Sequence, residues 1–170
     1  SEKDVLVGIA ASGRTPYVLG AMEYAKKLGA PVIGVSCCPG SQVDEAADIG
    51  IAPTPGPEVV TGSTRMKSGT AQKMILNMLS TGAMIRLGKV YGNLMVDVKP
   101  TNEKLVRRCV TIVCEATGEP EGKAVQALES CDYHCKTAIV MLLCGKTADE
   151  ARALLNRADG RVAEALRLKD

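Results

Sequence analysis

Segments typical of buried strands alternate with helical segments in the first part of this sequence, and this alternation limits the possible folds most. Residues 4–11 contain an unbroken apolar run of strand length, as in a parallel strand buried on both faces. A turn, SGRTP, follows it, and apolar residues then recur at helical spacing as far as Gly29. Residues 31–37 and 48–52 predict two further buried strands, with a short helix over 41–47 between them. The pattern predicts an α/β fold with a parallel sheet and right-handed crossovers.

The rest of the sequence is predicted to be mainly helical. Pro100 should end the secondary-structure element that precedes it, so we place the domain boundary close to this residue. We therefore expect an α/β domain over residues 1–100 and a small all-helical domain over residues 101–170. Helices are predicted over about 63–87, 102–117, 120–130, 134–144 and 147–156, the last opened by a capping box, Thr147 to Glu150.

Composition argues against several classes of partner. The net charge of +2 comes from 21 basic and 19 acidic residues spread along the chain, and there is no Phe or Trp to stack on bases. We therefore expect no nucleic-acid partner. The longest apolar stretches are shorter than the roughly 20 residues that a membrane-spanning helix needs, so no membrane partner is expected either.

The cysteines are predicted to be free thiols of a cytoplasmic protein. Their number, 7, is odd, and a chain of 170 residues does not need disulfides for stability. Cys131, His134 and Cys135 could suggest a zinc site, but no second pair of ligands stands at suitable spacing. We expect no metal, and His134 is interpreted as the start of a helix.

The turn Ser12-Gly13-Arg-Thr15 is the first candidate site. It joins the carboxyl end of a parallel strand to the N-terminus of a helix, where backbone N–H groups and the helix dipole favour an anion. The hydroxyl groups of Ser12 and Thr15 could add donors to a phosphate. The spacing alone leaves a second interpretation open, in which Thr15 is an ordinary N-cap and Ser12 only forms the turn.

A second candidate site surrounds the start of the long helix, where two or more of a group of polar residues could meet an anion: Glu58, Ser63, Thr64, Arg65, Lys67 and Ser68. The pattern also leaves open that Ser63 or Thr64 only caps the helix and that Arg65 and Lys67 pair with acidic residues elsewhere. No acidic residue stands between Glu58 and Asp97, and apolar residues cover more than one face of the helix. We therefore expect this helix to be buried among other elements or against a second subunit, and we expect a homodimer.

The sequence resembles the N-acetylmuramic acid 6-phosphate etherase family, within the sugar isomerase (SIS) superfamily, over essentially all 170 residues. The resemblance is carried by the helical tail and by two motifs, SGRTPYVLGAMEYAKKLGA and GPEVVTGSTRMKSGTAQKMILNMLSTGAMIRLGKVYGNLMVDVKPTN. The second motif is shared less closely with the glucokinase regulatory protein. The resemblance implies a flavodoxin-like parallel sheet of order 2-1-3-4-5, of which this chain would hold the third, fourth and fifth strands, with the amino-terminal strands missing.

The resemblance also implies an activity. The parent would be a lyase that cleaves the D-lactyl ether of N-acetylmuramic acid 6-phosphate, giving N-acetylglucosamine 6-phosphate and D-lactate in peptidoglycan recycling, without metal or redox cofactor. Ser12 and Thr15 match the family's second phosphate loop. The first phosphate loop and both acid/base glutamates lie upstream of residue 1, so no catalytic residue is expected in this chain. The missing amino-terminal segment is then a possible partner, and the chain alone is expected to be inactive.

The main alternative function is a non-catalytic, sugar-phosphate-binding regulator of the glucokinase-regulator type. Two glutamates at the etherase positions in the upstream sequence would favour the enzyme.

Overall fold

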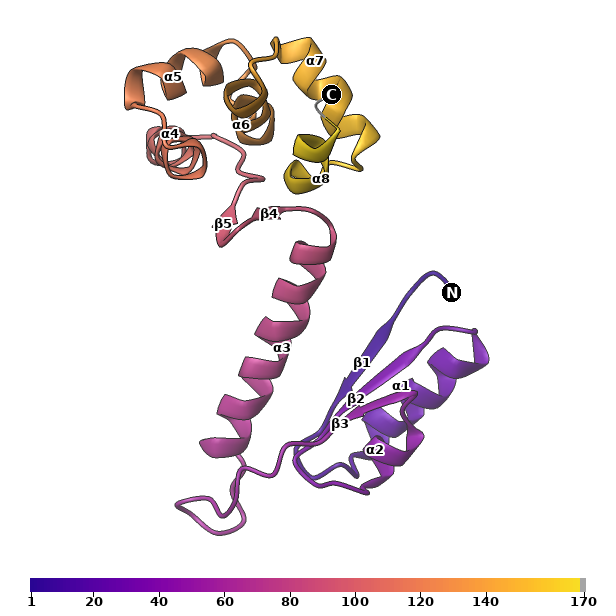
Figure 1. The fold of residues 1–170 in the computed structure, drawn as a ribbon. Coiled ribbons are helices and arrows are strands. Elements are labelled where there is room, and N and C mark those ends of the chain that lie inside the picture. The colour runs from indigo at the N-terminus through magenta and orange to yellow at the C-terminus, as the bar shows by residue number, and fades with distance from the viewer. Residues whose placement is uncertain (169–170) are drawn as a thin grey trace. The chain divides into compact units, whose positions relative to one another are not determined.

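The computed structural model describes residues 1–168. It contains two compact units, Ser1–Leu79 and Ser80–Asp170. Figure 1 shows a small sheet with two helices in the first unit and a group of helices in the second. Helix α3 (Lys67–Arg86) contributes residues to both units.

The first unit is built on a three-stranded parallel sheet with the order β1-β2-β3. The three predicted strands are confirmed, and their order agrees with the last three strands of a flavodoxin-like sheet. Each strand is shorter than its apolar run, because the ends of the runs belong to the connecting turns. The elements are β1 (Leu6–Ile9), α1 (Pro16–Lys27), β2 (Val32–Val35), α2 (Gln42–Ala46) and β3 (Ile49–Ile51).

A row of glycines allows α1 and α2 to lie close to the sheet. Gly8, Gly34 and Gly50 stand side by side in the strand register. A Cβ at Gly8 would lie 2.7 Å from Met22 Sδ, and one at Gly34 would lie 2.6 Å from the backbone oxygen of Val43. The glycine row therefore faces the helices, and Met22 and Val43 are fully buried against it.

Helix α3 begins at Lys67, later than the predicted start near Ser63. The Glu58 carboxylate accepts hydrogen bonds from the backbone N–H groups of Lys67 and Ser68, so the helix is capped from outside its own sequence. Within residues 1–168, the buried residues of α3 are Ser68 and Ile75. Large apolar side chains along it are exposed, among them Met74, Leu76, Met78, Met84 and Ile85. Burial of α3 against a second subunit stays a prediction.

The second unit contains a short antiparallel hairpin and five helices within the described residues. The four predicted helices and the capping box of Thr147 and Glu150 are confirmed, and His134 is the N-cap of α6. The hairpin and the last helix were not predicted, because both are too short for a clear periodic pattern. The elements are β4 (Val90–Tyr91), β5 (Leu94–Met95), α4 (Glu103–Thr117), α5 (Glu121–Glu129), α6 (Cys135–Cys144), α7 (Ala148–Arg157) and α8 (Val162–Arg167).

An ion pair fixes the end of the hairpin to α6. Lys136 is the only buried charged side chain of residues 1–168, and its Nζ lies 3.7 Å from Asp97 Oδ1. Lys89 Nζ lies 2.9 Å from the other carboxylate oxygen of Asp97. The hydrogen bond from Lys89, together with the Lys136 charge, lowers the pKa of Asp97, which keeps this carboxylate ionised beside the buried ammonium.

Residues on both sides of Pro100 share one core in the second unit, because Val96 and Val98 pack with apolar residues of the helices. The division into domains 1–100 and 101–170 stays a prediction, since compact units in one chain do not by themselves define domains. Within residues 1–168, no helix is both long and apolar enough to span a bilayer.

Candidate functional site

The turn between β1 and α1 has a fixed backbone. The Gly13 N–H donates to the Ala10 oxygen at 2.8 Å, and the Gly13 oxygen accepts from the Val43 N–H at 2.9 Å. Gly13 has a φ of +66°, and a Cβ at this position would overlap the Ser41 side chain. The glycine is therefore required both by the backbone conformation and by the contact with the start of α2.

The N-terminus of α1 is suited to an anion. Thr15 is its N-cap, but the Thr15 side chain makes no capping hydrogen bond, and the first turn contains no acidic residue. Arg14 is exposed, and no ion pair joins it to another residue within 1–168. An anion bound here can therefore interact with the helix dipole and the backbone N–H groups, and also with the side chains of Arg14 and Thr15.

The N-terminus of α3 is not free in this way. Glu58 Oε1 accepts from Ser68 N–H at 3.0 Å, and Oε2 accepts from Lys67 N–H at 3.1 Å. These bonds, that from Ser68 first, lower the pKa of the Glu58 carboxyl group. Because a carboxylate of the protein already occupies this helix end, the structure leaves α1 as the better anion site.

A cleft of about 580 Å³ brings the two candidate segments together. It is lined by Ser12 and Arg14 from the β1–α1 turn, by Cys37 and Cys38 after β2, and by residues of the segment 54–64 with Ser68. The cleft lies at the carboxyl ends of parallel strands, the usual ligand edge of such a sheet.

The structure brings only some of the predicted site residues into this cleft. Ser12, Glu58 and Ser63 line it. Gly13 shapes the turn and Thr15 caps α1 beside the cleft, without lining it. The cations chosen from the charge pattern lie elsewhere. Lys67 lines a shallower depression with Val59 and Met66, and Arg65 lines neither of the two hollows.

Sequence reasoning missed Arg14, Cys37 and Cys38 as lining residues. Arg14 stands between Ser12 and Thr15, the two residues predicted to bind phosphate, and this position in the motif is the signal that identifies it. The two cysteines directly follow the second strand, so they stand at the same sheet edge as the turn. The carboxyl-end rule for parallel sheets could have identified them.

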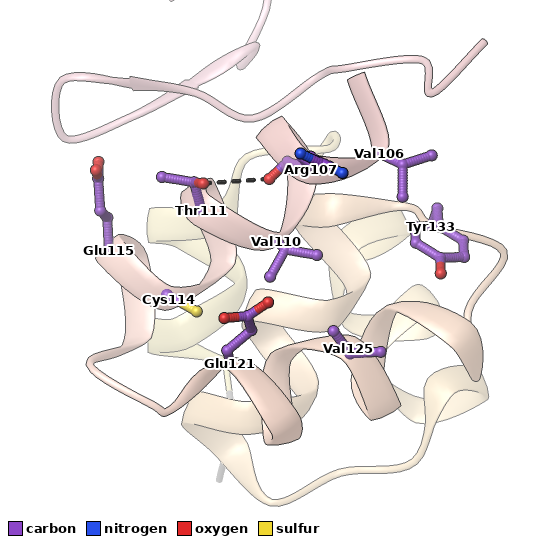
Figure 2. Close-up of a pocket in the computed structure, with 9 residues that line it drawn as sticks. All are labelled: Val106, Arg107, Val110, Thr111, Cys114, Glu115, Glu121, Val125 and Tyr133. Atoms are coloured by element: carbon purple, nitrogen blue, oxygen red, sulfur yellow. Dashed lines mark hydrogen bonds between the residues drawn. The ribbon is translucent and has the colours of Figure 1, made fainter. Parts of the chain in front are cut away.

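A second hollow, of about 640 Å³, lies between α4 and α5 in the helical unit (Figure 2). Its lining residues include Val110 and Arg107 of α4 and Val125 of α5. The N-terminus of α5 carries its own carboxylate, Glu121, in the first turn. The arrangement therefore suits a phosphate less well than the cleft beside α1. Among the described residues, no group of three or more His, Cys, Asp or Glu side chains could hold a metal ion.

Comparison with known proteins gives one consistent result. Residues 1–82 match the SIS domain family. The chain is 64% identical over 166 residues to the N-acetylmuramic acid 6-phosphate etherase of Aliivibrio fischeri strain MJ11, which covers 98% of this chain and 55% of the relative. It is 65% identical over 160 residues to the protein of that name from Photorhabdus laumondii, with 94% of this chain and 53% of the relative covered. It is 60% identical over 166 residues to the N-acetylmuramic acid 6-phosphate etherase of Klebsiella aerogenes, with 98% of this chain and 55% of the relative covered.

The chain spans about half the length of the curated relatives it matches. High identity extends over both of its compact units, since the aligned residues cover nearly the whole chain. The chain therefore belongs to the N-acetylmuramic acid 6-phosphate etherase family of SIS-domain proteins.

Proposed function

We propose that the full-length protein is an N-acetylmuramic acid 6-phosphate etherase and that this chain provides a large part of its sugar-phosphate site. The proposal rests on the N-terminus of α1 beside the cleft. This helix end is free, because the side chain of its N-cap residue, Thr15, makes no capping hydrogen bond. The full-length protein would release D-lactate and N-acetylglucosamine 6-phosphate. Nothing favours the regulator alternative over the activity that the relatives' names state.

In this proposal, the phosphate binds at the β1–α1 turn. Ser12 and Thr15 donate from their hydroxyl groups, Arg14 provides the positive charge, and Gly13 keeps the backbone donors in place. Ser63, which also lines the cleft, can hydrogen-bond the sugar. Arg65 and Lys67 remain candidates for the lactyl carboxylate, although neither lines the cleft in this chain.

The acid and base come from outside this chain. Loss of the lactyl group requires a base to take a proton from C2 and an acid to protonate the leaving oxygen, both with pKa values near the working pH. Glu58 is the only carboxylate that lines the cleft in the described part of the chain. Its pKa is lowered by two backbone N–H groups, which makes it a weak base and leaves it no proton to give at neutral pH. Glu58 is therefore assigned to positioning α3.

We also propose that the protein is a cytoplasmic homodimer. The exposed apolar residues of α3 provide the surface for a second copy. The phosphorylated substrate and the free thiols fit the cytoplasm.

The proposal is tested by replacing Ser12 and Thr15 together with Ala in the full-length protein. D-lactate release should show a KM for N-acetylmuramic acid 6-phosphate at least about tenfold higher, because each hydrogen bond to a charged group contributes about 1.5 to 3 kcal/mol. Thr111→Ala, which removes an exposed hydroxyl from α4, is the matched control and should leave KM unchanged. An unchanged KM in the double variant would exclude the turn as the phosphate site, and absence of D-lactate release by the unaltered protein would exclude the etherase.

A further inference from the structure

Two adjacent cysteines, Cys37 and Cys38, line the same cleft. They follow β2 and are the only neighbouring cysteines in the sequence. Their backbone is fixed, because Cys37 N–H donates to the Ala11 oxygen at 2.8 Å and Cys38 N–H donates to Ser36 Oγ at 3.2 Å. The buried Ser36 hydroxyl in turn donates to the Cys38 oxygen at 3.1 Å. The thiols are thus held at the cleft by an ordered turn.

The other cysteines are protected or isolated. Cys109, Cys131 and Cys135 are buried in the helical core. Burial raises the pKa of the Cys131 and Cys135 thiols, which suppresses their reactive thiolate form. Cys114 and Cys144 are partly buried and have no cysteine neighbour in sequence. Cys38 is exposed and Cys37 is partly exposed, so this pair is the most accessible dithiol of the described chain.

We propose that Cys37 and Cys38 form a dithiol site for soft thiophiles that bond two sulfurs at once, of which trivalent organoarsenicals are the type. Adjacent Cα atoms stand only about 3.8 Å apart, so two thiols that face one cleft can reach a single atom. Soft sulfur ligands favour soft centres. In the reaction, the arsenic–oxygen double bond of an arsine oxide is replaced by two arsenic–sulfur bonds. The two thiol protons leave with the oxygen as water, and no atom is oxidised or reduced.

The adduct stands in the same cleft as Ser12 and Arg14, so it excludes a sugar phosphate from the turn. This last consequence rests on the proposed function, whereas the dithiol site itself does not.

To test this, the native full-length protein is treated with phenylarsine oxide, and the adducts are located by mass spectrometry of the peptides of the treated protein. One arsenic should bridge Cys37 and Cys38, and 2,3-dimercaptopropanol should remove it while a monothiol does not. Cys38→Ser should weaken binding about a hundredfold, because the second arsenic–sulfur bond forms within one molecule. Cys144→Ser, the matched control, should leave the adduct unchanged. Absence of the bridge, or an equally stable adduct in Cys38→Ser, would overturn the proposal.

A competition arm separates this inference from the proposed function. N-acetylglucosamine 6-phosphate should slow formation of the adduct if both occupy one cleft. If the bridge forms at the same rate with and without the sugar phosphate, the dithiol site stands and the assignment of the phosphate to the β1–α1 turn fails.

Discussion

Gly13, in the turn between β1 and α1, has a φ of +66° and lies against the Ser41 side chain. Both properties exclude a side chain there, since a left-handed conformation costs other residues roughly 1 to 2 kcal/mol and Ser41 would also have to move. Gly13 therefore determines the backbone shape of the β1–α1 turn.

Gly13→Ala should therefore lower the free energy of unfolding of the first unit by about 2 kcal/mol or more, as measured by urea unfolding followed by circular dichroism. Gly20→Ala is the matched control, because Gly20 lies inside α1 with nothing within 4 Å of an added Cβ. It should stabilise the unit by about 0.5 to 1 kcal/mol. Equal effects of the two substitutions would contradict the role given to Gly13.

Glu58 provides a second prediction for a single residue, concerning pH. Folding lowers the pKa of Glu58 below its ordinary value of 4.5. The stabilisation that the Glu58 carboxylate gives to the start of α3 is therefore fully present above pH 4.5, and it is lost as the pH falls through the lowered pKa of the folded chain. The amide resonances of Lys67 and Ser68 should shift in this acidic range. Glu58→Gln should abolish the titration of both amides, measured by nuclear magnetic resonance.

Glu45→Gln is the control for this titration, since the Glu45 side chain is exposed and has no hydrogen bond to a described residue. It should leave the titration of the two amides unaltered. If the amides of Lys67 and Ser68 still titrate in Glu58→Gln, another group holds the start of α3.

Among the elements of the described chain, α3 has the largest number of exposed large apolar side chains. Met78 is 60% exposed and Met74 is 49% exposed, on a helix whose buried residues are Ser68 and Ile75. An apolar surface of this kind is typical of a protein–protein contact. The charge pattern of the sequence alone did not decide whether the chain itself or a partner covers this helix.

Met78→Glu in the full-length protein should raise the dissociation constant of the proposed homodimer at least about tenfold, because a charge replaces an apolar side chain in the contact. Sedimentation velocity at micromolar concentration measures the change. Lys73→Glu, on the same helix, alters charge without removing apolar surface and should have a smaller effect. A monomeric unaltered protein would refute the dimer.

At the scale of the whole molecule, the sheet of the first unit is covered on one face by α1 and α2, which lie on the same side of it (Figure 1). Val7, Ile33 and Ile49 stand in register on the face opposite the glycine row, and Ile49 is 59% exposed. β1 is also an edge strand of this sheet. An apolar face and an unpaired edge favour association with other chains.

The 170 residues alone should therefore aggregate and release no D-lactate. Absence of an acid/base pair typically costs a factor of about 10² to 10⁴ in rate, apart from any loss of the substrate site. Light scattering measures the aggregation, and a D-lactate assay measures the loss of activity. Turnover equal to that of the full-length protein would show that the catalytic groups lie within this sequence.

The sequence by itself determined the parallel α/β start, the helical remainder and the turn Ser12 to Thr15. These depend on residues a few positions apart, such as the apolar run of β1 or the capping box of Thr147 and Glu150. Ser12, Glu58 and Ser63, which belong to two separate candidate sites in the sequence, line one cleft in the structure, and their role in binding stays a prediction.

Only the tertiary structure decided which helix end is free for an anion. The Glu58 carboxylate reaches the backbone of Lys67 and Ser68 across a loop, and no local pattern of residue types reports such a contact. The same holds for Arg14, Cys37 and Cys38, which come from different connections and meet because parallel strands end at one edge of the sheet. Local periodicity sets the elements, whereas the partners of polar side chains depend on how loops distant in sequence pack together.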